Sequence, residues 1–252
     1  MSRLRRHKPV RVLVLQHDRQ SGLGAYERVL SQREAESEVV ELDSSRCLPD
    51  WRSFDAIMAL GGQASIATGS PPAWLADERQ YVREAVMSGV PYWGVCLGAQ
   101  LLATSLGARV YEGPRPEVGI RPVFLTDSGR RDPVFGRTPG KLNVFQWHAD
   151  GFELPRGAVL LAGSLAYPNQ AFRWRAHAYG IQFHLEVSPE MARAWAASPA
   201  YAAQLDVGVG RSRLAHLLVA LENHSTILGA IAESLLGRWL ALAEECRRRP
   251  AA

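Results

Sequence analysis

YWGVCLGAQLLATSLG, residues 92–107, joins an apolar run to a helical pattern around a single cysteine. The run 90–95 is short and apolar and contains a proline, which is typical of a buried strand, whereas Leu101, Leu102 and Leu106 recur at helical spacing. The segment therefore predicts a strand, a sharp turn at Cys96 and a helix.

Glycines flank Cys96 at the two positions where such a turn needs small residues. Gly94 and Gly98 stand two residues before and after it, which gives the pattern G-x-C-x-G, the thiol form of the hydrolase nucleophile elbow. The first N–H groups of the following helix would favour a thiolate and could bind an oxyanion. On this pattern alone, a small buried core cysteine remains the alternative.

Strand and helix patterns alternate on both sides of this turn. Apolar strand-like runs cover 10–16, 39–42 and 54–62, and helical patterns cover 24–35 and 73–89. This order predicts an α/β fold with a mostly parallel, doubly wound sheet and flanking helices. From 108 to 183, short strand-like pieces predict a β-rich second half.

The chain ends predict two additions to this domain. Residues 1–9 form a basic tail, 10–200 form the α/β domain, and 208–249 form a C-terminal helical extension. The extension is apolar on more than a narrow stripe. We expect it to pack on its own domain; a homodimer or partner surface is the alternative.

Composition narrows the class of protein. The chain has 252 residues, of which 47% are hydrophobic and 21% charged, as in globular domains. No apolar run approaches the ~20 residues of a membrane span, and the N-terminus lacks a signal-peptide pattern. Its three cysteines, Cys47, Cys96 and Cys246, are too widely spaced for a disulfide framework or a C-x-x-C metal site. We therefore expect a cytoplasmic protein that does not bind a membrane.

The charge distribution and the motifs of the sequence limit the ligands that we expect. The net charge of +4 comes with basic runs at the two ends of the chain, which are usually solvated, so we expect no nucleic-acid binding. A P-loop motif is absent from the sequence. We predict that the chemistry needs no metal and no organic cofactor.

A histidine and a glutamate could complete a nucleophilic site. His184 ends an apolar strand pattern, and Glu186 lies two residues further on, which places both side chains on one face of a strand. Glu186 could then orient one ring nitrogen while the other faces a thiol. A core histidine is the alternative for this pair taken alone.

A glycine pair follows the strand pattern at 54–60. Gly61 and Gly62 would let the backbone approach a ligand closely, so that their N–H groups complete an oxyanion hole with the N–H of Leu97. Ligand pockets of doubly wound sheets form at such strand ends. A plain tight turn explains the glycines equally well in isolation.

The three motifs GVCLGAQLLA, QFHLE and GGQ together resemble one family. Over about residues 10–195, they are similar to class I (triad-type) glutamine amidotransferases. The intervening segments resemble the stand-alone branch, whose members are similar to the amidotransferase domain of GMP synthase. The resemblance implies a flavodoxin-like α/β fold.

The resemblance also implies roles for particular residues. Cys96 would attack the glutamine side-chain amide, His184 would pass a proton to ammonia, and Glu186 would orient His184. The oxyanion would bind the N–H groups of Gly62 and Leu97. The implied substrate-binding residues are Gly61, Gln100, His148, Ala149 and Asp150. The last three belong to a loop at QWHAD. For His148 and Asp150, a hydrogen-bonded turn at a strand end is the alternative.

Three positions depart from the family pattern. Gln63 stands where proline usually follows the glycine pair, Leu185 replaces the proline of HPE, and Ala149 replaces a glycine of the substrate loop. None of these changes removes a triad side chain. They therefore bear on the identity of the substrate more than on the cysteine chemistry.

Three functions remain in view. The first is a glutaminase that hydrolyses L-glutamine through a Cys96 thioester and releases ammonia to an acceptor on a separate synthetase or other partner. The second is a γ-glutamyl hydrolase that acts on a γ-glutamyl amine or peptide. The third is a non-catalytic regulatory module, which would have no physical need for Cys96, His184 and Glu186 together.

Overall fold

The computed structural model describes residues 8–42, 47–67 and 73–248, so most of the predicted basic tail lies outside the described residues. The strands form one sheet of order β2-β1-β3-β4-β9-β8-β7-β5-β6. Their bounds are β1 Arg11–Gln16, β2 Glu36–Glu41, β3 Ala56–Ala59, β4 Tyr92–Val95, β5 Val110–Leu125, β6 Lys141–Phe152, β7 Ala158–Gly163, β8 Ala171–Trp174 and β9 Ala178–Ile181.

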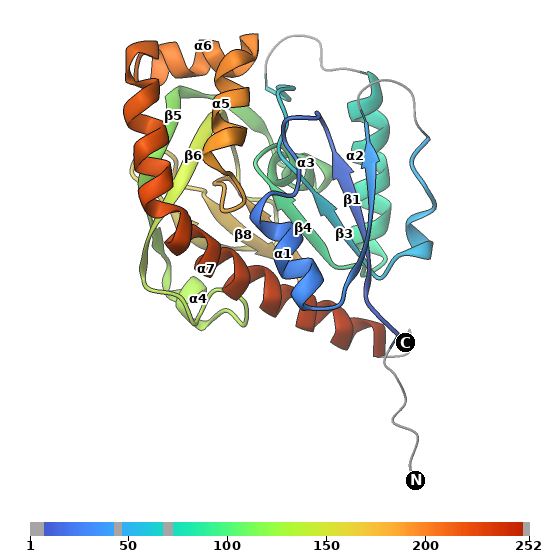
Figure 1. Ribbon diagram of the computed structural model, residues 1–252. Helices are drawn as coiled ribbons and strands as arrows, with labels where there is room; N and C mark the ends of the chain where they lie inside the picture. Colours follow the sequence, from blue (N-terminus) through green and yellow to red (C-terminus); the bar gives the residue numbers. More distant parts are fainter. Residues whose placement is uncertain (1–7, 43–46, 68–72, 249–252) are drawn as a thin grey trace.

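The helices lie on both faces of this sheet (Figure 1). The longer ones are α1 Ala25–Gln32, α2 Ala73–Met87, α3 Leu97–Ser105, α5 Pro189–Ala197, α6 Pro199–Gly208 and α7 Leu214–Arg248. The shorter ones are α4 Asp127–Arg131 and the 3-10 turns η1 Trp51–Ser53 and η2 Arg211–Arg213.

The sheet is parallel in one half and antiparallel in the other. Strands β2, β1, β3, β4 and β9 pair in parallel, whereas β8, β7, β5 and β6 add antiparallel pairs. The predicted α/β fold class is confirmed, and the β-rich second half makes the sheet a mixed one. Because β4 and β9 are parallel neighbours, the segments that follow them leave the same edge of the sheet.

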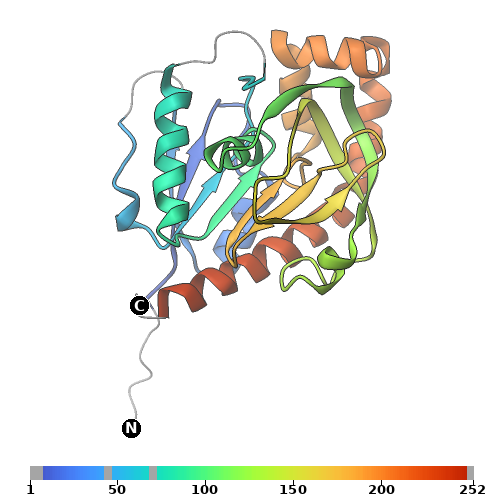
Figure 2. The same cartoon turned by 180° about the vertical axis from the view of Figure 1, so that it is seen from behind.

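Alternation along β1 divides the core between the two faces. Val12 and Val14 join the apolar cluster that includes residues of α1, α5 and α7, and Leu13 and Leu15 join the cluster that includes residues of α2 and α3. The two views from opposite sides show these helices on opposite faces (Figure 2). The strand is buried on both faces, which explains its continuous apolar run.

The long helix α7 packs on its own domain. Its buried residues recur at helical spacing, and Trp239, fully buried, lies 5.8 Å from Trp93 of β4 between ring centroids. By length and composition alone this helix could cross a bilayer, but 44% of its most apolar window is buried inside the domain. It is thus a core helix here. The end of the α/β domain at residue 200 and the start of the C-terminal extension at residue 208 remain predictions.

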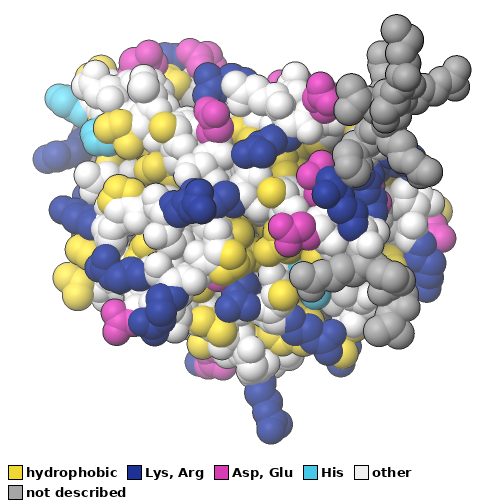
Figure 3. Space-filling view, turned by 90° about the horizontal axis from the view of Figure 1, so that it is seen from below, with side chains coloured by type: hydrophobic (Ala, Val, Ile, Leu, Met, Phe, Trp, Pro, Cys, Tyr) yellow, Lys and Arg dark blue, Asp and Glu magenta, His cyan; other side chains and the backbone are white. Residues whose placement is uncertain are grey.

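One surface can be described directly. Figure 3 shows the face below Figure 1, where Lys and Arg side chains lie singly or in small groups among apolar and acidic ones. Nucleic-acid-binding faces usually carry a continuous basic patch or stripe. The visible face does not have that pattern.

Candidate active site

Cys96 occupies a sharp turn between β4 and α3, as predicted. Its φ is +51° and its ψ is −104°, a backbone conformation that is uncommon for a residue with a side chain. A Cβ on Gly94 would lie 2.5 Å from the carbonyl oxygen of Gly98, and a Cβ on Gly98 would lie 2.1 Å from that of Ala59. The two glycines are therefore required by close packing.

The adjacent strand β9 delivers His184 to the same place. The Cys96 N–H donates to the Ile181 carbonyl at 2.8 Å, and the His184 N–H donates to that of Phe145 at 2.8 Å. Glu186 Oε1 lies 2.5 Å from His184 Nδ1, and both side chains are buried. The contact between these two residues is as predicted, although the pair lies just beyond the end of β9.

The charges around His184 favour its protonated form. Burial on its own would lower the pKa of this imidazole, but the negative charges of Glu186 and Cys96 and the hydrogen bond to Glu186 outweigh burial and raise the pKa to about 10. At neutral pH His184 is then an imidazolium. A cation beside the sulfur stabilises negative charge on Cys96.

Two aromatic side chains that the sequence patterns did not indicate form a stacked pair beside the histidine. The Trp195 ring of α5 meets the His184 ring edge-on with centroids 5.0 Å apart, and Tyr201 of α6 stacks on Trp195 at 4.8 Å. Both aromatic residues are buried. The His184 ring therefore packs against a buried aromatic pair.

The predicted oxyanion residues lie against the cysteine. A Cβ on Gly61 would lie 3.1 Å from His184 Cε1 and 3.7 Å from Cys96 Cβ, whereas a Cβ on Gly62 would lie 2.9 Å from Leu97 Cδ2. Within the described part of the chain, the N–H groups of Gly62 and Leu97 have no hydrogen-bond acceptor. Both donors are therefore unpaired, and Gly62 and Leu97 line the same pocket as Cys96.

A pocket of about 210 Å³ opens at this point. Its lining contains seven of the predicted site residues and, in addition, Glu112 from β5 and Tyr201 and Gln204 from α6. Gly61, His184 and Glu186 are not among its lining residues. The predicted residues in the lining are Gly62, Cys96, Leu97, Gln100, His148, Ala149 and Asp150.

Polar contacts fix the predicted substrate residues. Gln100 Nε2 donates to Gln182 Oε1 at 3.2 Å, and His148 Nδ1 lies 2.9 Å from the Asp150 carbonyl oxygen. Asp150 Oδ2 accepts from Ser65 Oγ at 2.6 Å. Burial raises the pKa of the Asp150 carboxyl, while the bond from Ser65 opposes that rise.

The prediction of a loop at QWHAD is wrong, because the backbone there is a β-strand. These residues belong to β6, where His148 pairs with Glu117 and Asp150 pairs with Glu112 across β5. The register shifts between Glu112 and Glu117, opposite Ala149, as in a β-bulge. The non-local pairing with β5 extends the strand through this polar segment.

The structure adds a buried ion pair under the glycine pair. His17, just after β1, contacts Glu78 of α2 through Nε2 at 3.0 Å, and its Nδ1 lies 3.3 Å from the Gly61 carbonyl oxygen. Gln63 follows the glycine pair, and its Oε1 accepts a hydrogen bond from Oγ of Ser198, which lies between α5 and α6. In the sequence, only the position of His17 after a buried strand gives a signal for such a role.

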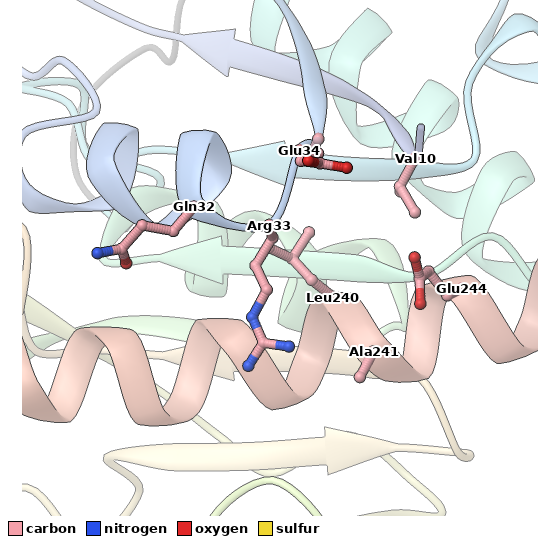
Figure 4. A pocket seen from close by; sticks show the side chains of 8 residues that line it. Val10, Gln32, Arg33, Glu34, Leu240, Ala241 and Glu244 are labelled. Atoms are coloured by element: carbon pink, nitrogen blue, oxygen red, sulfur yellow. The ribbon is translucent and has the colours of Figure 1, made fainter. Parts of the chain in front are cut away.

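A second hollow of about 220 Å³ lies at the opposite edge of the sheet, between the end of α1 and α7 (Figure 4). Arg33, which follows α1, extends toward α7 in this view, and Val10, Leu240 and Glu244 are among the other lining residues. No His, Cys, Ser or Thr is among its described lining residues. In the described ranges, no cluster of three His, Cys, Asp or Glu residues suits a metal ion.

Comparison with known proteins agrees with this geometry. The family model "Glutamine amidotransferase class-I" matches residues 20–195. A glutamine amidotransferase crystal structure from Thermotoga maritima superposes with a TM-score of 0.77 at 30% identity, covering 93% of this chain and 99% of that chain. A second, from Methylobacillus flagellatus, gives 0.78 at 27% identity, covering 93% and 95%.

Curated relatives match over a shorter part. The glutamine amidotransferase-like protein YfeJ of Salmonella typhimurium is 33% identical over 56% of this chain and 61% of its own length. One subunit of the glutamine-hydrolysing GMP synthase of Thermococcus kodakarensis is 31% identical over 57% of this chain and 77% of its own length. This chain thus spans less than two thirds of YfeJ. With its elbow, its His–Glu pair and a family match over most of its length, the chain belongs to the class I glutamine amidotransferase family.

Proposed function

We propose that the protein is a glutaminase that hydrolyses the side-chain amide of L-glutamine through a Cys96 thioester. One observation carries this proposal: Cys96 lines a pocket, and the buried His184–Glu186 pair lies close to it, because both Cys96 and His184 are next to Gly61. Membership of the amidotransferase family supports glutamine as the substrate. The residue roles below belong to the same proposal.

The first half of the reaction forms the thioester. The Cys96 sulfur attacks the amide carbon, and the carbonyl π electrons move to oxygen, where the N–H groups of Gly62 and Leu97 bind the oxyanion. As the oxyanion collapses, the C–N bond breaks and His184 gives its proton to the departing nitrogen. Ammonia leaves, and the γ-glutamyl group stays on sulfur.

The second half returns the enzyme to its starting state. His184, now neutral, accepts a proton from water, and the resulting hydroxide attacks the thioester carbon. The C–S bond breaks, glutamate leaves, and Cys96 recovers its negative charge beside the protonated His184. Glu186 stabilises the imidazolium at both stages, because its carboxylate lies against Nδ1.

Release of ammonia calls for an acceptor. The relative from Thermococcus kodakarensis is named as one subunit of a glutamine-hydrolysing synthase, which supports a synthetase or other acceptor-binding partner in trans. We predict low activity for the isolated protein and a rise when that partner binds.

An odd number of widely spaced cysteines and a thiol nucleophile both suit a reducing compartment, so we propose a cytoplasmic location.

One observation favours a second candidate, a γ-glutamyl hydrolase for amines that carry a positive charge. The pocket presents the carboxyl groups of Glu112 and Asp150, and no Lys or Arg is among its described lining residues. Such a lining attracts a cationic amine as readily as the α-ammonium group of glutamine. The two candidates differ in the leaving group alone.

Product analysis tests both candidates. The purified protein and its Cys96→Ala variant are incubated with L-glutamine and, separately, with γ-glutamyl derivatives of cationic and neutral amines. Glutamate and ammonia formed from glutamine by the wild type alone support the glutaminase. Glutamate released only from the conjugates supports the hydrolase, and equal rates for wild type and variant contradict both.

A further inference from the structure

The ion pair of His17 and Glu78 is a costly feature for a protein interior. His17 Nε2 lies 3.0 Å and 3.1 Å from the two carboxylate oxygens of Glu78, and both side chains are 1% exposed. Two buried charges lose their hydration, and an apolar pair of similar volume would often be as stable. The pair therefore calls for a role other than holding the fold together.

Its hydrogen bonds fix the protonation state of His17. An ionised carboxylate only accepts hydrogen bonds, so Nε2 donates to Glu78; a carbonyl oxygen also only accepts, so Nδ1 donates to Gly61. Both ring nitrogens then carry protons. Burial alone would lower the pKa of His17, but the charge and hydrogen bond of Glu78 and the backbone contacts raise it.

The Gly61–Gly62 peptide lies between His17 and the candidate nucleophile. A Cβ on Gly62 would lie 2.7 Å from His17 Cβ, whereas a Cβ on Gly61 would lie 3.1 Å from His184 Cε1. In a planar trans peptide, the C=O of one residue and the N–H of the next point in opposite directions. Because the Gly61 carbonyl points to His17, the Gly62 N–H points away from it.

We propose that His17, held by Glu78, is a positioning residue that locks the Gly61–Gly62 peptide with the Gly62 N–H aimed at the oxyanion. This inference rests on the proposed acyl chemistry of Cys96. Glycines offer little resistance to rotation of a peptide plane, so a fixed external donor is needed to keep the hole preorganised. Trp74 supports the ring, with centroids 5.8 Å apart and planes 26° from parallel.

Two double variants separate positioning from packing. His17→Asn with Glu78→Gln removes both charges but keeps an N–H donor near the Nδ1 position, whereas His17→Leu with Glu78→Met removes the charges and the donor. Each side chain is replaced by one of similar size, and thermal melting checks that both proteins fold. For each protein, kcat and KM are measured with glutamine, together with acylation by p-nitrophenyl acetate and alkylation by iodoacetamide.

The proposal predicts that the substitutions slow some of these reactions and leave others unchanged. In the Leu/Met variant, kcat and the acylation rate fall about 10- to 100-fold, because both reactions pass through an oxyanion. KM and the iodoacetamide rate stay within about twofold, since displacement at the iodoacetamide carbon forms no oxyanion. The Asn/Gln variant should recover most of the acylation rate.

Other outcomes overturn the proposal. Equal acylation rates in the Leu/Met variant and the wild type, or equal losses in both double variants, would show that the Gly61 contact does not position the oxyanion donor. If the Leu/Met variant does not fold, His17→Leu with Glu78→Gln replaces it as the test. This variant also lacks the donor and differs from the Asn/Gln variant at position 17 alone, so its acylation rate should fall about as far, and an unchanged rate contradicts the proposal. A wild type that is acylated by the ester but ignores glutamine would count against the proposed substrate alone.

Discussion

Glu186 holds His184 with one carboxylate oxygen and is itself held through the other. Oε1 lies 2.5 Å from His184 Nδ1, and Oε2 accepts the Leu185 N–H at 2.9 Å. The carboxylate cannot rotate without breaking one of these bonds. His184 therefore presents Nε2, its other ring nitrogen, away from Glu186. Nε2 is buried and has no hydrogen-bond partner among the described residues, and the nearby charge of Cys96 helps to raise the pKa of the ring.

Glu186→Gln should lower kcat by roughly 10²- to 10⁴-fold while leaving KM nearly unchanged, a smaller loss than that from Cys96→Ala. The glutamine oxygen can still accept from Nδ1, but it no longer stabilises the imidazolium by charge. Steady-state kinetics with the substrate that proves active checks this. Glu190→Gln, at an exposed position on α5, is the matched control and should not change kcat. A loss equal to that from Cys96→Ala would mean that Glu186 does more than orient and stabilise.

The pH profile should reflect the raised pKa of His184, about 10. The protonated ring is the active form, so kcat/KM should fall only as the pH approaches 10. The same shift contributes stability that is complete below the unfolded pKa of about 6.5 and is lost as the pH rises through about 10. Removing the charge in Glu186→Gln should move the alkaline limb of kcat/KM to lower pH. A limb at the same pH in both proteins would assign it to another group.

Gly98→Ala and Gly229→Ala should change stability in opposite directions, although both glycines lie in helices. A Cβ at 98 would lie 2.1 Å from the Ala59 carbonyl oxygen, whereas a Cβ at 229 would meet nothing within 4 Å. We expect a loss of about 1–3 kcal/mol for the first change and a gain of up to about 1 kcal/mol for the second. Urea unfolding of both variants measures this, and equal effects would contradict the packing described at the elbow.

Trp239→Ala should destabilise the protein by about 3–5 kcal/mol, because this fully buried side chain packs on Trp93 and joins α7 to the sheet. Val219→Ala is the control on the same helix; its side chain is 61% exposed, so a change within about 0.5 kcal/mol is expected. Chemical denaturation measures both. Similar small losses for the two variants would mean that α7 is not part of the core.

The elbow and the His–Glu pair could be predicted from the sequence because their signals are short and local. G-x-C-x-G contains the whole turn, and H-x-E places two side chains within one stretch of chain. The strand pattern at 10–16 is equally direct, since a strand buried on both faces is a continuous apolar run.

Features that depend on distant parts of the chain could not be predicted in this way. His17 and Glu78 are 61 residues apart, and neither belongs to a motif. The backbone at His148 is a strand because β5 pairs with it, a contact that the polar segment QWHAD does not indicate. Helix α6, with Tyr201 and Gln204 in the pocket wall, has small residues and a weak apolar pattern, so it gives no clear helical signal.

The most direct test of the proposed cysteine chemistry measures which thiol a glutamine-like electrophile labels. The wild type, Cys96→Ala and Cys47→Ala are treated with 6-diazo-5-oxo-L-norleucine, and the labelled site and its rate are read by mass spectrometry. Cys47 is exposed and serves as the reference thiol. We expect one label, on Cys96, formed much faster than at Cys47 and slowed by L-glutamine or a γ-glutamyl amine. Labelling of Cys96 no faster than Cys47, with no protection by either compound, would contradict a nucleophilic role for Cys96.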